Sequence, residues 1–383
     1  MTTFRELIDS SRVIICAGSG GVGKTTTAAV LAIDAARAGR RAVVVTIDPA
    51  KRLADALGLP ALAPDPVVID PAHWSREDSV PGGRLSAMML DPKATFDALV
   101  ARHAADDAQA TRILENGFYR TISSALGGTQ EYMAMEKLHE LHEDGDDDLI
   151  VIDTPPSRHA LDFLDAPERL LRLLDNRVFR VLIAPARTGL RVAGVAVQAL
   201  VRTASRVVGT EVVDDIVAFF RAFEGMEEGF RERARRVRQV IGEPTTQFVL
   251  VTSPRRDAVL EAEHFAQAIG DHGYRVAGLV VNRVHPQFGS GRGDVLHARG
   301  AALRELPQAD AAVTAARHRL ADRLETLGDF QEVAARERRH LEGVRLRLGT
   351  GAAVAFVPFL PHDVHDVGAL DAIARRLLDD DGT

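Results

Sequence analysis

The chain has 383 residues, of which 46% are hydrophobic, so it can form two average domains or one enlarged α/β domain with a sizeable core. Its formal net charge of −7 argues against non-specific nucleic-acid binding, and we expect no nucleic-acid partner. The single cysteine, Cys16, excludes disulfides and cysteine-based zinc sites within one chain, so no structural zinc is expected. The N-terminus lacks an apolar signal core, and charged residues, Pro and Gly interrupt the most apolar window, 178–201. We therefore expect a cytoplasmic protein.

Apolar, β-branched runs separated by helical patterns are typical of buried parallel strands. The runs are Val13–Ile15, Ala42–Ile47, Leu85–Leu90, Leu149–Ile152, Phe248–Thr252, Val276–Val281 and Ala353–Pro358. The alternation predicts an α/β fold, with a doubly wound, mostly parallel sheet. Two helix-only blocks interrupt it. We expect residues 92–142 and 160–244 to form an inserted helical subdomain, and residues 1–91, 143–159 and 245–383 to form the domain that contains the sheet.

A glycine loop joins the first strand to an Ala-rich helical pattern, and Gly18–Thr25 satisfies the phosphate-loop pattern G-x-x-x-x-G-K-[ST]. The sheet is therefore expected to be of the P-loop NTPase type, and the domain that contains it to be the ATPase domain. Glycines let consecutive backbone N–H groups converge on phosphate oxygens, and the helix N-terminus adds its positive dipole end. Lys24 would reach the β- and γ-phosphates of ATP, and the Thr25 hydroxyl would ligate Mg²⁺. The predicted nucleotide-binding residues of this loop are Ser19, Gly20, Gly21, Val22, Gly23, Lys24, Thr25 and Thr26.

The second predicted strand ends at Asp48, in the sequence Thr46-Ile47-Asp48-Pro49-Ala50. A carboxylate at the C-terminal end of such a strand sits over the nucleotide crevice of an open α/β sheet. Asp48 is therefore a candidate to orient or deprotonate the attacking water. The structural alternative is that Asp48 caps a helix that begins near Pro49.

The fourth predicted strand ends at Asp153 after four apolar residues, so Asp153 would hold Mg²⁺ directly or through water. Arg158 follows five residues later and has two interpretations. Its guanidinium could approach the γ-phosphate as a catalytic arginine finger, or it could pair with Asp162 along a helix.

These motifs resemble those of the ArsA/GET-type anion-transporting ATPases. Gly20–Thr25 is similar to their deviant Walker A loop, Asp48-Pro49-Ala50 to their switch I, and the segment after Asp153 to their switch II. The resemblance runs in order from about Val13 to Leu378 and implies a dimeric ATPase in which Asp48 is catalytic. It departs from the family pattern at Pro155, Ser157 and Arg158, where that pattern has Ala, Thr and Gly.

The resemblance also implies an adenine pocket. Asn282 lies in a segment that is similar to the family's adenine-side loop, and its amide offers a donor and an acceptor to a purine edge. The alternative is an Asn that caps a turn after a strand. Pro358 and Phe359 match the loop that packs around the base, and they would supply apolar walls.

Ser19 is the main departure from the family pattern. In the family, a lysine at this position crosses the dimer interface to the partner's nucleotide, and a serine cannot supply that charge. We therefore expect a heteromer with a paralogous ATPase subunit, or a homodimer in which Arg158 supplies the charge in cis.

Three functions compete. The first is an ATP-driven switch that acts on a membrane-protein or transporter client, with the apolar segment 178–208 either lining a client groove or packing internally. The second is a regulatory subunit that binds ATP and hydrolyses it weakly. The third, a partition- or division-type ATPase, is disfavoured by the acidic end of the last predicted helix, Asp379-Asp380-Asp381.

Overall fold

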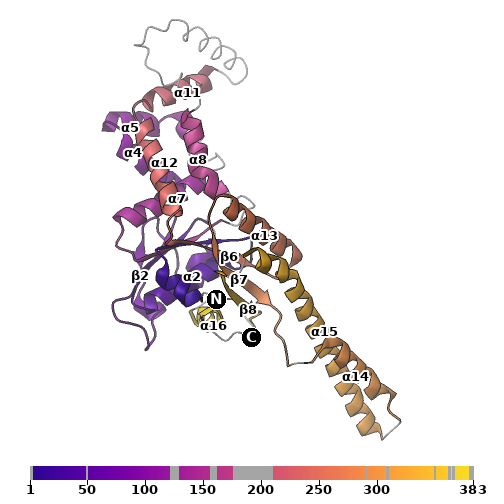
Figure 1. Cartoon of the computed structure of the whole chain (residues 1–383). Helices are drawn as coiled ribbons and strands as arrows, with labels where there is room; N and C mark the ends of the chain where they lie inside the picture. The colour runs from indigo at the N-terminus through magenta and orange to yellow at the C-terminus, as the bar shows by residue number, and fades with distance from the viewer. Residues whose placement is uncertain are drawn as a thin grey trace.

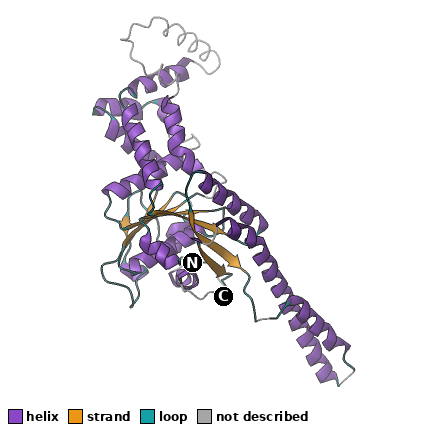
Figure 2. Cartoon of the chain, viewed as in Figure 1, coloured by secondary structure: helices purple, strands orange, loops and turns teal. Residues whose placement is uncertain are grey.

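A central sheet of eight strands organises the chain (Figures 1 and 2). The computed structural model describes residues 3–48, 51–120, 129–155, 162–175, 210–289, 291–307, 310–348, 351–360, 364 and 367–378. The strand order is β3-β4-β2-β5-β1-β6-β7-β8, and neighbouring strands are parallel except β3 and β4. The strands are β1 (Val13–Ala17), β2 (Arg41–Thr46), β3 (Val67–Val68), β4 (Arg84–Met89), β5 (Leu149–Asp153), β6 (Thr246–Thr252), β7 (Val276–Val284) and β8 (Ala353–Pro358). This confirms the predicted α/β class and mostly parallel sheet.

All seven predicted strands form. Every residue of β1 and β5 is buried, as expected for strands with helices on both sheet faces. The sequence analysis missed β3, whose two exposed valines pair antiparallel with β4 at the sheet edge. A two-residue strand carries too short a pattern to be recognised from periodicity.

Two hydrophobic cores lie on the two faces of the sheet. One face is covered by α1 (Phe4–Ser10), α2 (Lys24–Arg37), α3 (Arg52–Ala56) and α16 (Val367–Leu378). The alanines of α2 are buried almost throughout, because their small side chains let this helix lie close to the sheet. A short 3-10 helix, Pro71–His73, lies between β3 and β4 in the chain.

The other face carries α13 (Arg256–Asp271) and a group of helices that extends beyond the sheet (Figure 1). The group comprises α4 (Pro92–His103), α5 (Asp107–Leu114), α7 (Thr129–Asp144), α8 (Asp162–Asp175), α11 (Thr210–Ala222) and α12 (Glu227–Ile241). Aspartates cap α4 and α5 at their N-termini, Asp91 and Asp106 each accepting a backbone N–H bond. The exact division into two domains stays a prediction. Within the described ranges, no helix combines the length and apolarity needed to cross a bilayer.

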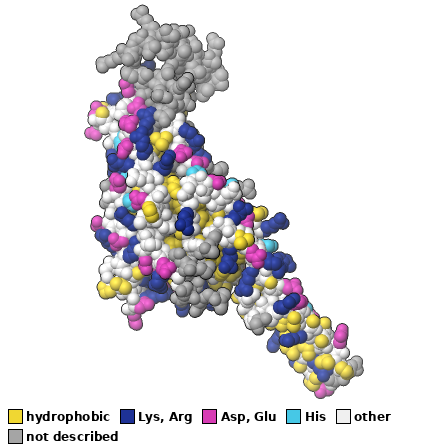
Figure 3. Space-filling model, viewed as in Figure 1, with side chains coloured by type: hydrophobic (Ala, Val, Ile, Leu, Met, Phe, Trp, Pro, Cys, Tyr) yellow, Lys and Arg dark blue, Asp and Glu magenta, His cyan; other side chains and the backbone are white. Residues whose placement is uncertain are grey.

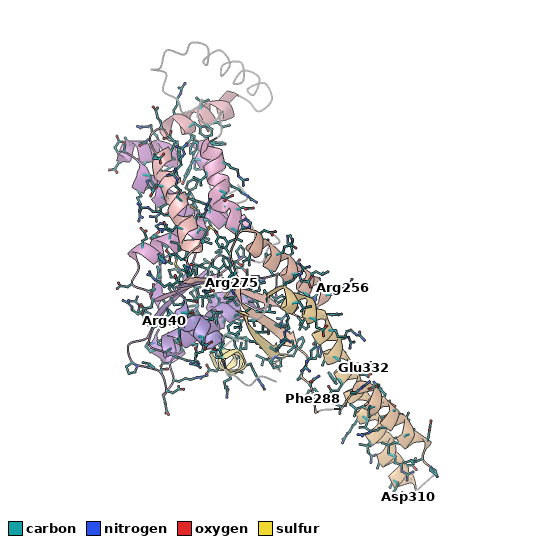
Figure 4. The ribbon with its side chains drawn as sticks, in the orientation of Figure 1. Arg40, Arg256, Arg275, Phe288, Asp310 and Glu332 are labelled. Carbon is teal, nitrogen blue, oxygen red and sulfur yellow. The ribbon has the colours of Figure 1, made fainter. Side chains whose placement is uncertain are left out.

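Two helices leave the body as an arm (Figures 1 and 4). They are α14 (Gly293–Glu305) and α15 (Ala311–Leu348), and they pack against each other, while the C-terminal part of α15 returns to α13. The sequence analysis did not anticipate the reversal of the chain between Glu305 and Ala311.

The helical group contains a buried polar cluster centred on Arg233 of α12. Arg233 forms an ion pair with Glu136 of α7 at 2.5 Å, and His139 lies one helical turn further along α7. His139 is fully buried, and neither of its ring nitrogens has a hydrogen-bond partner among the described residues. Burial lowers the pKa of His139, and the positive charge of Arg233 lowers it further.

This cluster predicts a loss of stability on acidification. The pKa of His139 is lower in the folded chain than in the unfolded chain. Above the unfolded value the imidazole is neutral in both states. Below it the unfolded chain binds a proton that the folded chain does not, so the free energy of unfolding decreases as the pH falls toward the folded value. Replacing His139 by Leu should reduce the stability lost between pH 7 and pH 5.5 by up to about 1 kcal/mol. Urea unfolding of both proteins at the two pH values measures this. An equal loss in both proteins would show that His139 is not responsible.

Candidate nucleotide site

The phosphate loop lies between β1 and α2, and two of its glycines are required by close contacts. Gly18 (φ +152°) and Gly23 (φ +102°) both have positive φ. A Cβ on Gly18 would collide with the Val251 carbonyl oxygen, and one on Gly23 would collide with the Asn282 side chain. Glycine at these two positions therefore preserves the backbone conformation in which N–H groups can face an anion.

A buried carboxylate, Asp153 at the end of β5, lies beside this loop. Its Oδ2 accepts hydrogen bonds from the Thr25 hydroxyl at 2.7 Å and from the Thr46 hydroxyl at 3.0 Å. Its Oδ1 is also buried, but has no hydrogen-bond partner in the described part of the chain. Burial raises the pKa of Asp153 to about 6, against the lowering effect of both hydroxyls.

This donor set fits a hard divalent cation. Carboxylate and hydroxyl oxygens are preferred Mg²⁺ ligands, and a cation would compensate the unpartnered Oδ1 of Asp153. Thr25 and Asp153 are thus residues that could hold Mg²⁺, as their positions in the sequence suggested.

The lysine of the loop is buried and close to two carboxylates. Lys24 Nζ donates to the Ser19 carbonyl oxygen at 2.9 Å, so it is already directed back over the loop. Burial lowers the pKa of Lys24, while the charges of Asp153 and Asp48 oppose this. Arg52 is also close enough to lower the pKa of Lys24 by charge repulsion. Two cationic and two anionic side chains therefore meet at this loop, with the Lys24 ammonium directed over it.

Asp48 is buried just beyond the end of β2. Its Oδ2 forms an ion pair with the Arg52 guanidinium at 3.0 Å, and its backbone N–H donates to the Thr46 hydroxyl at 3.2 Å. The next helix, α3, begins at Arg52 with Lys51 in the capping position, so Asp48 is not its N-cap. The alternative that Asp48 serves as the cap of this helix is therefore not observed.

Asn282 holds the phosphate loop from the other side. It lies within β7, which continues to Val284, and not in a loop after the strand. Its Nδ2 donates to the Val22 carbonyl oxygen at 2.8 Å, and its Oδ1 accepts from the Arg283 N–H at 2.9 Å. Arg283 has a positive φ of 60°, uncommon for a residue other than glycine. Both ends of the amide are thus engaged within the protein.

The last strand ends beside β7. Pro358 closes β8, and the Phe359 N–H donates to the Val284 carbonyl oxygen at 3.1 Å. The Phe359 ring is about half exposed and lies 5.3 Å from the His285 ring. The His285 side chain bonds Glu337 of α15 at 2.6 Å, which ties the arm to this edge of the sheet.

The structure thus brings most of the predicted residues to one edge of the sheet. Ser19 to Thr26 and Asp48 follow β1 and β2, and Asp153 is the last residue of β5, which lies between these two strands. Asn282 and Pro358 lie near the ends of β7 and β8, and Phe359 follows β8. Arg158 lies outside the described residues. Sequence reasoning missed Arg52, although it stands four residues after Asp48, a spacing that pairs opposite charges on a helix.

Comparison with known proteins yields one family and several fungal relatives. The sequence model described as "Anion-transporting ATPase" matches residues 11–303. The "ATPase get3" of Botryotinia fuckeliana is 26% identical over 294 residues, which cover 75% of this chain and 77% of that protein. The "ATPase get3" of Schizosaccharomyces japonicus is 24% identical over 286 residues, 74% of this chain and 78% of that protein. The match to the "ATPase GET3" of Chaetomium globosum, 31% identical over 176 residues, spans only about half of each protein, 45% and 48%.

The Asn282 contact predicts an effect on nucleotide affinity. Replacing Asn282 by Ala removes the bond to Val22, so the loop loses a net stabilisation of about 1 kcal/mol and ATP affinity should fall about fivefold. Asn116→Ala is the matched control, since Asn116 donates a similar bond to the Asp215 carbonyl oxygen in the helical group. Calorimetric titration with ATP measures both. Equal affinity in Asn282→Ala and wild type would refute the holding role.

Proposed function

The chain belongs to the anion-transporting ATPase family, and from that premise we propose that it is a cytoplasmic, nucleotide-driven switch. It binds ATP with Mg²⁺, hydrolyses the γ-phosphate bond, and uses closure between two subunits to act on a membrane-protein or transporter client. A regulatory subunit with weak hydrolysis of its own is the second candidate, because Ser19 replaces the crossing lysine.

The observation that carries the proposal is the contact between Thr25 and Asp153. The Thr25 hydroxyl, on the second residue of α2, donates to Asp153 Oδ2, on the last residue of β5, at 2.7 Å. Lys24 is the first residue of the same helix. Phosphate-loop ATPases need a hydroxyl and a carboxylate at one point to hold Mg²⁺. When bound, Mg²⁺ would neutralise charge on the β- and γ-phosphate oxygens.

Each residue of the loop then has a role. The backbone N–H groups from Ser19 to Thr26 surround the phosphates, and Lys24 exchanges the Ser19 carbonyl oxygen for phosphate oxygens. Asn282 keeps the loop in position, while Pro358 and Phe359 border the base.

Asp48 is proposed to orient the attacking water. Its carboxylate is buried, lies at the C-terminal edge of the sheet, and influences the pKa of Lys24, so it is close to the expected phosphate position. The ion pair with Arg52 fixes the carboxylate orientation before nucleotide binds.

Replacing Asp48 by Asn should keep ATP binding within about threefold and lower kcat on the order of 10²-fold, because the amide cannot accept a proton. Steady-state hydrolysis together with ATP titration measures both quantities. Asp55→Asn, an exposed carboxylate on α3, is the matched control and should retain full activity. A variant that keeps its turnover would move the catalytic base elsewhere, with Asp153 as the next candidate.

The client would bind the helical group, which packs on the sheet through α7 and extends away from it (Figure 1). Closure at the nucleotide site would then move these helices. The apolar segment 178–208, the proposed client groove or internal interface, lies outside the described residues.

Ser19 determines the assembly that we propose. Its side chain cannot provide a charge to a second subunit, so a paralogous subunit with lysine at this place would complete the site in trans. In a homodimer, Arg52 or Arg158 would have to provide the charge in cis, and the charge of Arg52 acts on Lys24.

Replacing Ser19 by Lys should raise the ATPase rate of the isolated protein on the order of tenfold or more, because it restores a cation at the interface. Ser19→Ala, which adds no charge, should leave the rate unchanged. The rates of the three proteins, alone and mixed with the paralogue, provide the measurement. If wild type alone already matches the mixed complex, complementation in trans is wrong, and Arg52→Gln and Arg158→Gln then identify the cation that acts in cis.

A further inference from the structure

The arm formed by α14 and α15 extends well beyond the body of the protein. With 38 residues, α15 is about 57 Å long at 1.5 Å per residue. Figure 4 labels Glu332 midway along the arm and Asp310 at its tip. The distal half of α15 packs on α14, while the proximal half packs on α13.

Small residues form the seam between the two helices. Gly293 and Gly300 of α14 face Gly328 and Ala321 of α15, and a Cβ on Gly300 would lie 3.2 Å from the Ala321 carbonyl oxygen. This seam brings the backbones close together and needs few large apolar side chains. Leu296, between the two glycines of α14, is buried, while the larger apolar residues in the distal half of α15 lie beside the seam.

These larger residues form a stripe on α15. Val313, Leu320, Leu324 and Leu327 follow one another at spacings of seven, four and three residues, which places them on one side of the helix. Leu320 is 49% exposed, and Val313 is exposed to a similar extent. Figure 3 shows hydrophobic side chains gathered over the distal half of the arm. Leu324 and Leu327 are half-buried, so the exposed part of the stripe lies at Val313 and Leu320. An exposed apolar patch rimmed by polar residues marks an interaction surface.

Arginines flank the stripe on the side away from α14. At 100° per residue, Arg323 and Arg319 lie about 60° and 100° from Leu320, opposite to the direction of Ala321. Neither arginine has an ion-pair partner among the described residues.

The carboxylates of the same region contact side chains of α14. Arg304 binds Asp322 at 2.7 Å and Glu325 at 2.8 Å, and His297 lies 3.4 Å from Asp329 and 3.7 Å from Glu332. On the side of the stripe away from α14, the charged side chains are therefore Arg319 and Arg323, and their charge is positive.

We propose that the distal arm, defined by Val313, Leu320, Leu324, Leu327, Arg319 and Arg323, binds an acidic amphipathic helix of a partner protein. The partner helix carries apolar residues at the same spacing, with Asp or Glu beside them. A second copy of the arm fits less well, because it would bring its own arginines to the contact while its carboxylates lie on the side that faces α14. A membrane surface also fits less well, because the stripe is narrow and the helix has no broad apolar face.

The test uses the full chain and two labelled 21-residue peptides, measured by fluorescence anisotropy. Both peptides have Leu at the first and fourth positions of three heptads, and they carry either Glu or Lys at the flanking positions. The Glu peptide should bind at least about tenfold more tightly than the Lys peptide, and its affinity should fall with added salt.

Variants locate the contact. Leu320→Asp should abolish binding of the Glu peptide, while Leu346→Asp, at an 82% exposed leucine of the same helix outside the stripe, should not change it. Reversing both charges, Arg319→Glu with Arg323→Glu, should transfer the preference to the Lys peptide. These residues lie on the surface, and retained ATP binding shows that each variant is folded.

Three results would overturn the proposal. The first is equal binding of the two peptides, or an unchanged affinity in Leu320→Asp. The second is self-association of wild type in sedimentation velocity that Leu320→Asp removes, without peptide binding. The third is flotation with phosphatidylcholine–phosphatidylserine vesicles, again without peptide binding.

Discussion

The Asp153 carboxylate connects the parts of the molecule on which its activity depends. Through Oδ2 it joins β5 to the start of α2 at Thr25 and to the end of β2 at Thr46. Complete burial makes this carboxylate costly to ionise, and its second oxygen is left without a hydrogen bond among the described residues. A fold tolerates such a group where a ligand compensates it. The same arrangement therefore accounts for the position of the phosphate loop and for the expected magnesium site.

A second series of contacts leads from the phosphate loop to the arm. Asn282 binds the Val22 carbonyl oxygen at 2.8 Å, and three residues later His285 binds Glu337 of α15 at 2.6 Å. The Phe359 N–H joins β8 to the same segment at Val284. The end of β7 and the residue that follows it thus contact the loop, the base of the arm and the end of the last strand. A shift of the loop on nucleotide binding would act on the arm through these direct contacts.

The sequence predicted what depends on local pattern. Buried β-branched runs placed seven strands, and the glycine loop with Asp48 and Asp153 placed one edge of the site. Contacts between distant segments could not be read in this way. The Asn282 amide is directed to Val22, 260 residues earlier in the chain, which no spacing rule indicates. The arm was missed as a hairpin because its seam consists of glycines and alanines, which leave no apolar periodicity to mark two helices. The role of Arg52 depends on its closeness to Lys24, which appears only in the folded chain.

The central claim is that Gly18–Thr25 and Asp153 form one site for the phosphates of ATP and Mg²⁺. Calorimetric titration of wild type and Lys24→Ala with ATP, in the presence and absence of Mg²⁺, tests it most directly. We predict that Mg²⁺ strengthens ATP binding to wild type, and that Lys24→Ala weakens it at least about 30-fold, because a charged hydrogen bond worth about 2 kcal/mol or more is lost. Equal affinities of the two proteins for ATP, with no dependence on Mg²⁺, would contradict the account.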